Sequence, residues 1–166
     1  MKKTTAYSCL LLSSVVLAII SCSSPKADNT VEENIKTYTH TWDEIVNKGD
    51  LKQFDSAFAP TVIYDNVAIH LQGVNDVRNY FSGFITGFTN RDFKVLEIYG
   101  QGERVIKRWS FTGTHTGDFA GIKPTGKRIT VEGVTIARMV NGKITEERDY
   151  ADDLGLMQKL GVIPPM

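Results

Sequence analysis

The residues best suited to acid–base chemistry lie near the end of the chain. A strand-like segment at 143–151 leads to two adjacent carboxylates, Asp152 and Asp153, just before a short helical pattern. Because alternate residues of a strand share a face, we expect Glu146, Arg148 and Asp152 on one side of it. If that side lines a pocket, Asp152 can act as the general base that removes a proton from a carbon beside a carbonyl. The alternative is that Asp152 or Asp153 caps the final helix, a role that carboxylates fill well.

Arg148 and His115 are the other candidates for a part in catalysis. A cation four residues before Asp152 on the same face would lower the pKa of that carboxyl and offer a site for an anionic group. The alternative for Arg148 is a structural ion pair with Glu146 or Asp152. His115 ends a strand-like run, and a neutral imidazole there could polarise a carbonyl or relay a proton. The alternative is a loop histidine that binds the backbone of the segment 117–127.

Aromatic residues with a polar edge form a third group of candidates. Tyr38, Trp42 and Tyr64 each offer a ring face to an apolar ligand and a hydrogen-bonding group to its polar part. Most of the remaining aromatic side chains are expected in the core. The set predicted to line a substrate pocket is Tyr38, Trp42, Tyr64, Asp65, Trp109 and Glu146.

The composition argues against several other classes of function. The three histidines lie far apart and follow no zinc-binding spacing. The chain also has no Gly-x-Ser-x-Gly elbow and no glycine-rich phosphate loop before a helix. We therefore predict neither a metal nor a cofactor. With 19 Lys and Arg against 19 Asp and Glu, and no basic stripe, we expect no nucleic acid partner.

The elements that must position these residues follow from periodicity and turn signals. Apolar residues at three- and four-residue steps predict helices, and alternation predicts strands. The expected helices are 31–46, 51–58, 75–89 and 154–160, and the expected strands are 62–64, 93–99, 105–114, 128–140 and 143–151. Asn75 is expected to cap the third helix, and Asn141-Gly142 indicates a two-residue hairpin turn. Helices gathered before a run of long strands predict an α+β fold, with a curved antiparallel sheet wrapped around the N-terminal helices as a cone with an internal pocket.

Six short motifs occur in a fixed order along this framework. They are Arg108-Trp109, Gly113-Thr114-His115-Thr116-Gly117, Gly121-Ile122, Pro124-Thr125-Gly126-Lys127, Asn141-Gly142-Lys143-Ile144 and Gln158-x-Leu160-Gly161. Through them the chain resembles the SnoaL-like polyketide (ester) cyclases of the nuclear transport factor 2-like, cystatin-like group, over roughly residues 31–163. The resemblance implies three N-terminal helices and a hydrophobic pocket. It also implies an aspartate that serves as acid and base in an intramolecular aldol ring closure, without cofactor or metal.

The same resemblance bears on individual positions. The family pattern Glu-x-Trp-x-x-x-Asp falls on Glu146 and Asp152, with Arg148 in place of the tryptophan. An arginine there would make the pocket cationic. Asp65 falls where relatives often carry a polar pocket group, and is a second acid candidate. Two functions remain open: a cyclase or isomerase that uses Asp152, and a module that binds a small apolar molecule, or forms a homodimer through its sheet, without chemistry.

The N-terminus predicts where the domain works. Lys2 and Lys3 precede an apolar run that ends at Ser21-Cys22, as in a bacterial lipoprotein leader. We therefore expect a signal peptide at 1–21, a lipidated Cys22 with a tether at 22–30, and a SnoaL-like domain at 31–166. Acyl chains on Cys22 would anchor an exported protein to a membrane of the bacterial cell envelope. The alternative is an ordinary signal peptide with an incidental cysteine.

Overall fold

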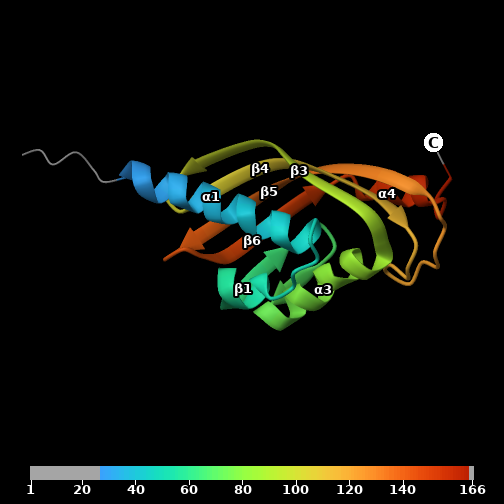
Figure 1. Cartoon of the computed structure of the whole chain (residues 1–166), viewed down its shortest axis with the longest axis horizontal. Coiled ribbons are helices and arrows are strands. Elements are labelled where there is room, and N and C mark those ends of the chain that lie inside the picture. The colour runs from blue at the N-terminus through green and yellow to red at the C-terminus, as the bar shows by residue number, and fades with distance from the viewer. Residues whose placement is uncertain (1–26, 165–166) are drawn as a thin grey trace, which may run out of the picture.

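A computed structural model describes residues 27–164 of the chain (Figure 1). In chain order the elements are α1 (Ala27–Val46), α2 (Gln53–Ala57), β1 (Phe58–Asp65), β2 (His70–Gln72), α3 (Val74–Gly87), β3 (Phe88–Gln101), β4 (Arg104–His115), β5 (Arg128–Val140), β6 (Lys143–Ala151) and α4 (Asp153–Leu160). The predicted lipidation site, Cys22, lies outside the described residues. Within 27–164, no helix is both long and apolar enough to cross a membrane.

One curved sheet forms the body of the domain, and its strands lie in the order β2-β1-β6-β5-β4-β3. The predicted α+β class is confirmed. The predicted antiparallel pairing holds for β1 with β2 and for β3 to β6, but β1 pairs with β6 in parallel, so the curved sheet is mixed. The difference arises because β1 joins the sheet beside the last strand. The helix α3 then carries the chain to β3 at the opposite edge, and the remaining strands fold back as antiparallel hairpins.

Turn chemistry fixes the hairpin between β5 and β6. Asn141 and Gly142 both adopt positive φ angles, 51° and 72°, which two-residue turns between twisted strands require. The turn and the limits of β5 and β6 therefore agree with the sequence prediction. Pairing between β4 and β5 is continuous along both strands, so the two strands form a regular wall.

Several element limits and one predicted helix cap differ from the prediction. The helix α1 begins at Ala27 rather than Val31, and β1 already begins at Phe58, where a helix was expected to end. The expected cap by Asn75 is also wrong. The cap residue of α3 is Gly73, whose φ of 97° suits glycine, and it makes no side-chain cap bond.

The core lies between the helices and the concave face of the sheet. The helix α1 lies across the sheet, α3 packs beside β1, and α4 lies at the end of the sheet near the C-terminus (Figure 1). Tyr38, Trp42 and Ile45 of α1 are buried, as their shared helical face predicts. The cluster continues with Phe54, Phe58, Val62, Tyr64, Val77, Phe88, Val105, Phe111, Ile129, Val131, Met139 and Ile144.

A β-bulge in β6 decides which acids face that core. Arg138 pairs with Glu146 and the next residue, Met139, pairs with Ile144, so Thr145 is an extra residue between two register positions. Ile144 and Glu147 are both fully buried although three positions separate them. An extra residue exchanges the two faces of a strand. Beyond Thr145, therefore, the odd-numbered residues face inward, and the predicted even-numbered face is wrong.

Candidate active site

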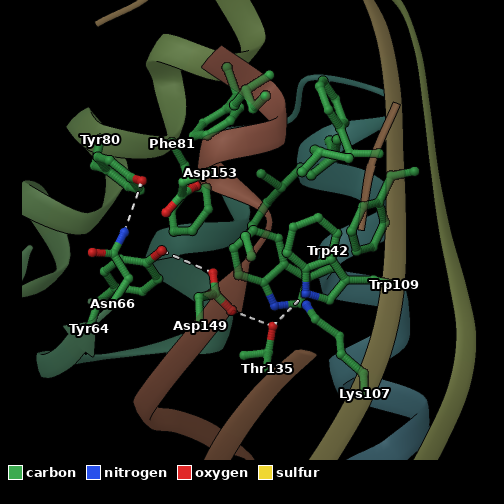
Figure 2. A pocket seen from close by; sticks show the side chains of 18 of the residues that line it. Trp42, Tyr64, Asn66, Tyr80, Phe81, Lys107, Trp109, Thr135, Asp149 and Asp153 are labelled. Atoms are coloured by element: carbon green, nitrogen blue, oxygen red, sulfur yellow. Dashed lines mark hydrogen bonds between the residues drawn. The ribbon is translucent and has the colours of Figure 1, made fainter. Parts of the chain in front are cut away.

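A pocket of about 70 Å³ lies between α1, α3 and the concave face of the sheet (Figure 2). Most of its wall is aromatic or aliphatic. The lining residues are Trp42, Ile45, Val46, Tyr64, Asn66, Tyr80, Phe81, Phe84, Ile85, Phe93, Lys107, Trp109, Phe111, Val131, Thr135, Asp149, Ala151, Asp153 and Leu156. An apolar wall with a few converging polar groups is typical of small-molecule sites.

Asp149 is the carboxylate that two hydroxyl groups hold on this wall (Figure 2). Its Oδ2 accepts a hydrogen bond of 2.9 Å from the Tyr64 hydroxyl, and its Oδ1 accepts one from the Thr135 hydroxyl. Trp109 Nε1 in turn donates to Thr135 Oγ1 at 2.9 Å. Thr135 and Asp149 lie directly opposite each other on β5 and β6, which explains why they meet. Burial raises the pKa of Asp149, while the charge of Lys107 and the two hydroxyl donors oppose the rise.

Lys107 is the cation of the pocket. It comes from β4, its side chain is 2% exposed, and it is one of the lining residues. Its Nζ lies 4.1 Å from the centroid of the Trp42 ring, 4.5 Å from that of Tyr38 and 5.2 Å from that of Phe93. Ring faces attract a cation, but they replace little of the hydration that it loses on burial. Burial therefore lowers the pKa of Lys107 to about 8, although the nearby carboxylates favour the charged form.

Glu147 is a second buried acid, behind the pocket wall. Its Oε1 accepts hydrogen bonds from the Tyr38 hydroxyl and, at 3.0 Å, from Trp42 Nε1. Its Oε2 has no partner among the described residues. Burial raises the pKa of Glu147 to about 7, with the positive charge of Lys107 opposing the rise and the charge of Asp149 adding to it.

Polar groups also mark one side of the pocket. Asn66 Nδ2 donates to the Tyr80 hydroxyl at 3.4 Å (Figure 2). Asn66 Oδ1 accepts hydrogen bonds from the backbone N–H groups of Ala68 and Ile69. Asp153 adds a carboxylate to the lining, and partial burial raises its pKa, with the charge of neighbouring Asp152 adding to the rise. Asn66 is thus a fixed amide that can hydrogen-bond a ligand on the side opposite Lys107.

The structure places the predicted base, Asp152, outside the pocket. It is the N-cap of α4, it is exposed, and its side chain accepts a hydrogen bond of 2.9 Å from the N–H of Gly155. The alternative, a helix cap, is therefore confirmed. The predicted position was wrong because the bulge at Thr145 turns the even-numbered residues of β6 to the outer face.

Three other predicted pocket residues also lie outside the pocket: Arg148, Glu146 and Asp65. Arg148 Nε lies 3.2 Å from Glu146 Oε1 and 3.7 Å from Asp65 Oδ2, and none of the three lines the pocket. Arg148 is exposed, so the alternative of a structural ion pair is confirmed. Arg104 also contacts Glu146, at 3.2 Å. These residues form part of a charged outer surface of the sheet.

His115 is fully buried but does not line the pocket. Its Nδ1 accepts a hydrogen bond of 3.3 Å from the backbone N–H of Thr125, and its ring lies 5.1 Å from that of Phe88. The alternative of a loop histidine that fixes the 117–127 segment is thus confirmed. Trp42, Tyr64 and Trp109 do line the pocket as predicted, while Tyr38 lies behind it, bonded to Glu147.

Sequence reasoning missed Lys107 and Asp149, which line the pocket, and Glu147, which lies behind its wall. Lys107 had a usable signal, because it shares the inward register of β4 with Val105 and Trp109. Glu147 and Asp149 had none, because their direction depends on the bulge. Within residues 27–164, no cluster of three or more His, Cys, Asp or Glu side chains could hold a metal ion.

The fold and this pocket define a cone-shaped α+β domain with a buried acid–base cluster, and comparison with known proteins supplies the family. A profile of the SnoaL-like polyketide cyclases matches residues 36–160. The chain therefore belongs to the SnoaL-like polyketide cyclase family. Among solved structures, a Jannaschia protein described as a SnoaL-like polyketide cyclase superposes with a TM-score of 0.74 at 21% identity, covering 81% of this chain and 95% of that one.

Named relatives and a second solved structure are similar to parts of the chain. The aklanonic acid methyl ester cyclase DnrD of Streptomyces peucetius is 35% identical over 40% of this chain and 46% of its own length. That alignment spans less than half of the relative. The aklanonic acid methyl ester cyclase AcmA of Streptomyces galilaeus is 30% identical over 78% of each chain. AclR from the same species has a TM-score of 0.73 at 25% identity, covering 82% of this chain and 85% of AclR.

Proposed function

We propose that this domain binds a small carbonyl compound in its apolar pocket and catalyses cofactor-free ring closure or isomerisation, with Asp149 as acid and base. The observation that carries the proposal is the Asp149 carboxyl, held on an apolar wall by the hydroxyl groups of Tyr64 and Thr135. A pKa raised by burial makes a carboxylate a stronger base. Membership of a family with ring-closing relatives supports the same reaction class.

The chemistry needs only residues of this chain. The ionised Asp149 removes a proton from a carbon beside a carbonyl, and the electron pair moves onto the carbonyl oxygen to give an enolate. The charge of Lys107, on the same pocket wall, stabilises that oxygen. The enolate carbon then attacks a second carbonyl carbon of the same molecule, closing the ring. The new alkoxide takes back the proton from Asp149, which restores the carboxylate.

The size of the pocket restricts the substrate. Ligand pockets usually enclose about 300–1,000 Å³. The pocket here has about 70 Å³, so it holds a compact chain or one end of a larger molecule. A fused polyketide would require the aromatic side chains of α3 to move. This favours a substrate smaller than the aklanonic acid esters for which the relatives are named.

The test compares two variants on one substrate. A 1,5-diketone such as 2,6-heptanedione closes to a cyclic aldol, which loses one water to give a conjugated cyclohexenone that is followed by its ultraviolet absorbance. We expect Asp149→Asn to slow this closure by about 100-fold or more, as loss of a general base does. Asp152→Asn, on the helix cap outside the pocket, is the matched control and is expected to leave the rate unchanged. Equal rates for Asp149→Asn and the unmodified protein would refute the assignment.

The second candidate function is binding without catalysis, and the small volume of the pocket favours it. In that case the diketone binds to the unmodified protein with no ring closure and no exchange of its α-hydrogens with deuterated water. The lipid anchor is a separate proposal that rests on the Ser21-Cys22 sequence. It is tested by feeding bacteria an alkyne-tagged fatty acid: Cys22→Ser should abolish labelling and release the protein from the membrane fraction.

A further inference from the structure

We propose that Lys107 is a covalent carbonyl-capture site, at which the amine condenses with a ketone or aldehyde to form an imine inside the pocket. The inference uses the pocket of the proposed function but does not depend on ring closure. A carbonyl compound that enters the pocket reaches a wall to which a single amine contributes, together with the carboxyl of Asp149. These two groups are the minimum that imine formation requires, a nucleophile and a proton donor.

The surroundings of Lys107 differ from those of the surface lysines. Among the described residues, Lys107 Nζ makes no hydrogen bond, and no carboxylate oxygen lies within 4.0 Å of it as an ion-pair partner. Its neighbours are the ring faces of Trp42, Tyr38 and Phe93. By contrast, Lys94 is a surface residue, 63% exposed and 2.9 Å from Asp92. The Lys107 amine thus has no carboxylate in contact that would hold it in the protonated form.

Burial also makes the free amine more abundant. A pKa of about 8, in place of the ordinary 10.5, leaves a much larger neutral fraction of Lys107 near neutral pH. At about pH 7 the neutral fraction is about 10%, which is about 300-fold above that of an ordinary lysine. Only the neutral amine attacks a carbonyl, and desolvated lysines are the usual imine-forming residues of enzymes.

The condensation balances with groups present in the pocket. The neutral Lys107 amine attacks the carbonyl carbon, a C–N bond forms, and the C=O electron pair moves to oxygen. Proton transfer from nitrogen to oxygen gives a carbinolamine. Asp149, in its protonated form, then donates a proton to the departing hydroxyl, which leaves as water. The products are a protonated imine, a molecule of water and the ionised Asp149, whose charge stabilises the iminium cation.

The experiment uses 2,4-pentanedione as the probe, because a lysine converts this diketone into a stable conjugated enaminone with loss of one water. The purified protein is incubated near neutral pH, the near-ultraviolet absorbance of the enaminone is followed, and the modified peptide is located by mass spectrometry. We expect modification of Lys107 at least ~10-fold faster than of Lys94 in the same sample, allowing for the lower nucleophilicity of a less basic amine. Lys107→Met should remove the fast phase, and Lys94→Met should retain it.

Peptide mapping by mass spectrometry uses the unmodified protein, so it tests the proposal even if Lys107→Met does not fold. Modification of Lys107 no faster than that of Lys94, or modification confined to surface lysines, would overturn the proposal. The outcome is separable from that of the proposed function. If the acid–base role of Asp149 fails, the enaminone still forms at Lys107. If carbonyl capture fails, ring closure can still depend on Asp149.

Discussion

Replacement of Glu147 by glutamine should make the protein more stable at neutral and alkaline pH. Glu147 is fully buried, and its Oε2 has no hydrogen-bond partner among the described residues. Its pKa is about 7 in the folded protein, against an ordinary value of 4.5. Between these two pH values the folded state keeps a proton that the unfolded chain has released. The free energy of unfolding therefore falls as the pH rises through this window, and the loss is complete above pH 7.

The expected size follows from the same shift. Each unit of difference in pKa is worth about 1.4 kcal/mol, so ionisation of Glu147 costs the folded state about 3 kcal/mol. Glutamine keeps an oxygen for the Tyr38 and Trp42 donors and cannot ionise. Its amide nitrogen carries two N–H donors, one more than the protonated carboxyl, so Glu147→Gln should be up to about 1 kcal/mol less stable than the unmodified protein near pH 4. Near pH 8, where Glu147 is ionised, the variant should be about 2 kcal/mol more stable than the unmodified protein.

Urea denaturation at a series of pH values measures this difference directly, because the transition midpoint reports stability when the slope is constant. Glu146→Gln is the matched control on the outer face. Its ion pairs with Arg104 and Arg148 are solvent-exposed, so we expect less than about 1 kcal/mol at any pH. If Glu147→Gln is instead less stable than the unmodified protein near pH 8, Glu147 is ionised as a stabilising partner of Lys107, and the reasoning fails.

Three further substitutions test other parts of the structure. Asp152→Ala should lower stability by about 1 kcal/mol through loss of the helix cap, with ligand affinity unchanged in a binding titration. Gly133→Ala should cost about 1–3 kcal/mol, because the added Cβ would lie 2.5 Å from Cζ2 of Trp109; thermal unfolding measures the loss and tryptophan fluorescence the displaced ring. Tyr64→Phe removes a donor that favours the ionised form of Asp149, so the pKa of Asp149 should rise further and the acid limb of the pH–rate profile should move to higher pH.

Local sequence rules were sufficient to predict the hairpin turn between β5 and β6. Asn141-Gly142 predicts the turn between β5 and β6 because few residues adopt two successive positive φ angles. Alternation likewise predicts most of β4 and β5. The parallel pairing of β1 with β6 was not predictable in this way, because no local signal in 58–65 specifies a partner that lies about 80 residues further on.

The sequence did not predict the buried charged residues Lys107, Glu147 and Asp149 for a different reason. Alternation predicts directions only while the register is unbroken, and one extra residue at Thr145 reverses every later side chain of β6. The chain offers acids on both faces, Glu146 on one and Glu147 and Asp149 on the other. No pattern within 143–151 distinguishes them. A lysine in the inward register of β4 was the one usable signal, because a buried Lys107 requires a carboxylate nearby.

The bulge also removes one argument against catalysis. The family resemblance placed Arg148 at the position of a tryptophan, and an arginine inside the pocket would lower the pKa of the base and make the wall polar. Its guanidinium instead pairs with Glu146 and Asp65 on the outer face. The pocket wall therefore stays apolar. Among the described residues, the only cation that lines it is Lys107, and burial lowers the pKa of that amine to about 8. A base with a raised pKa beside an easily neutralised amine suits carbonyl chemistry better than the binding of an anion.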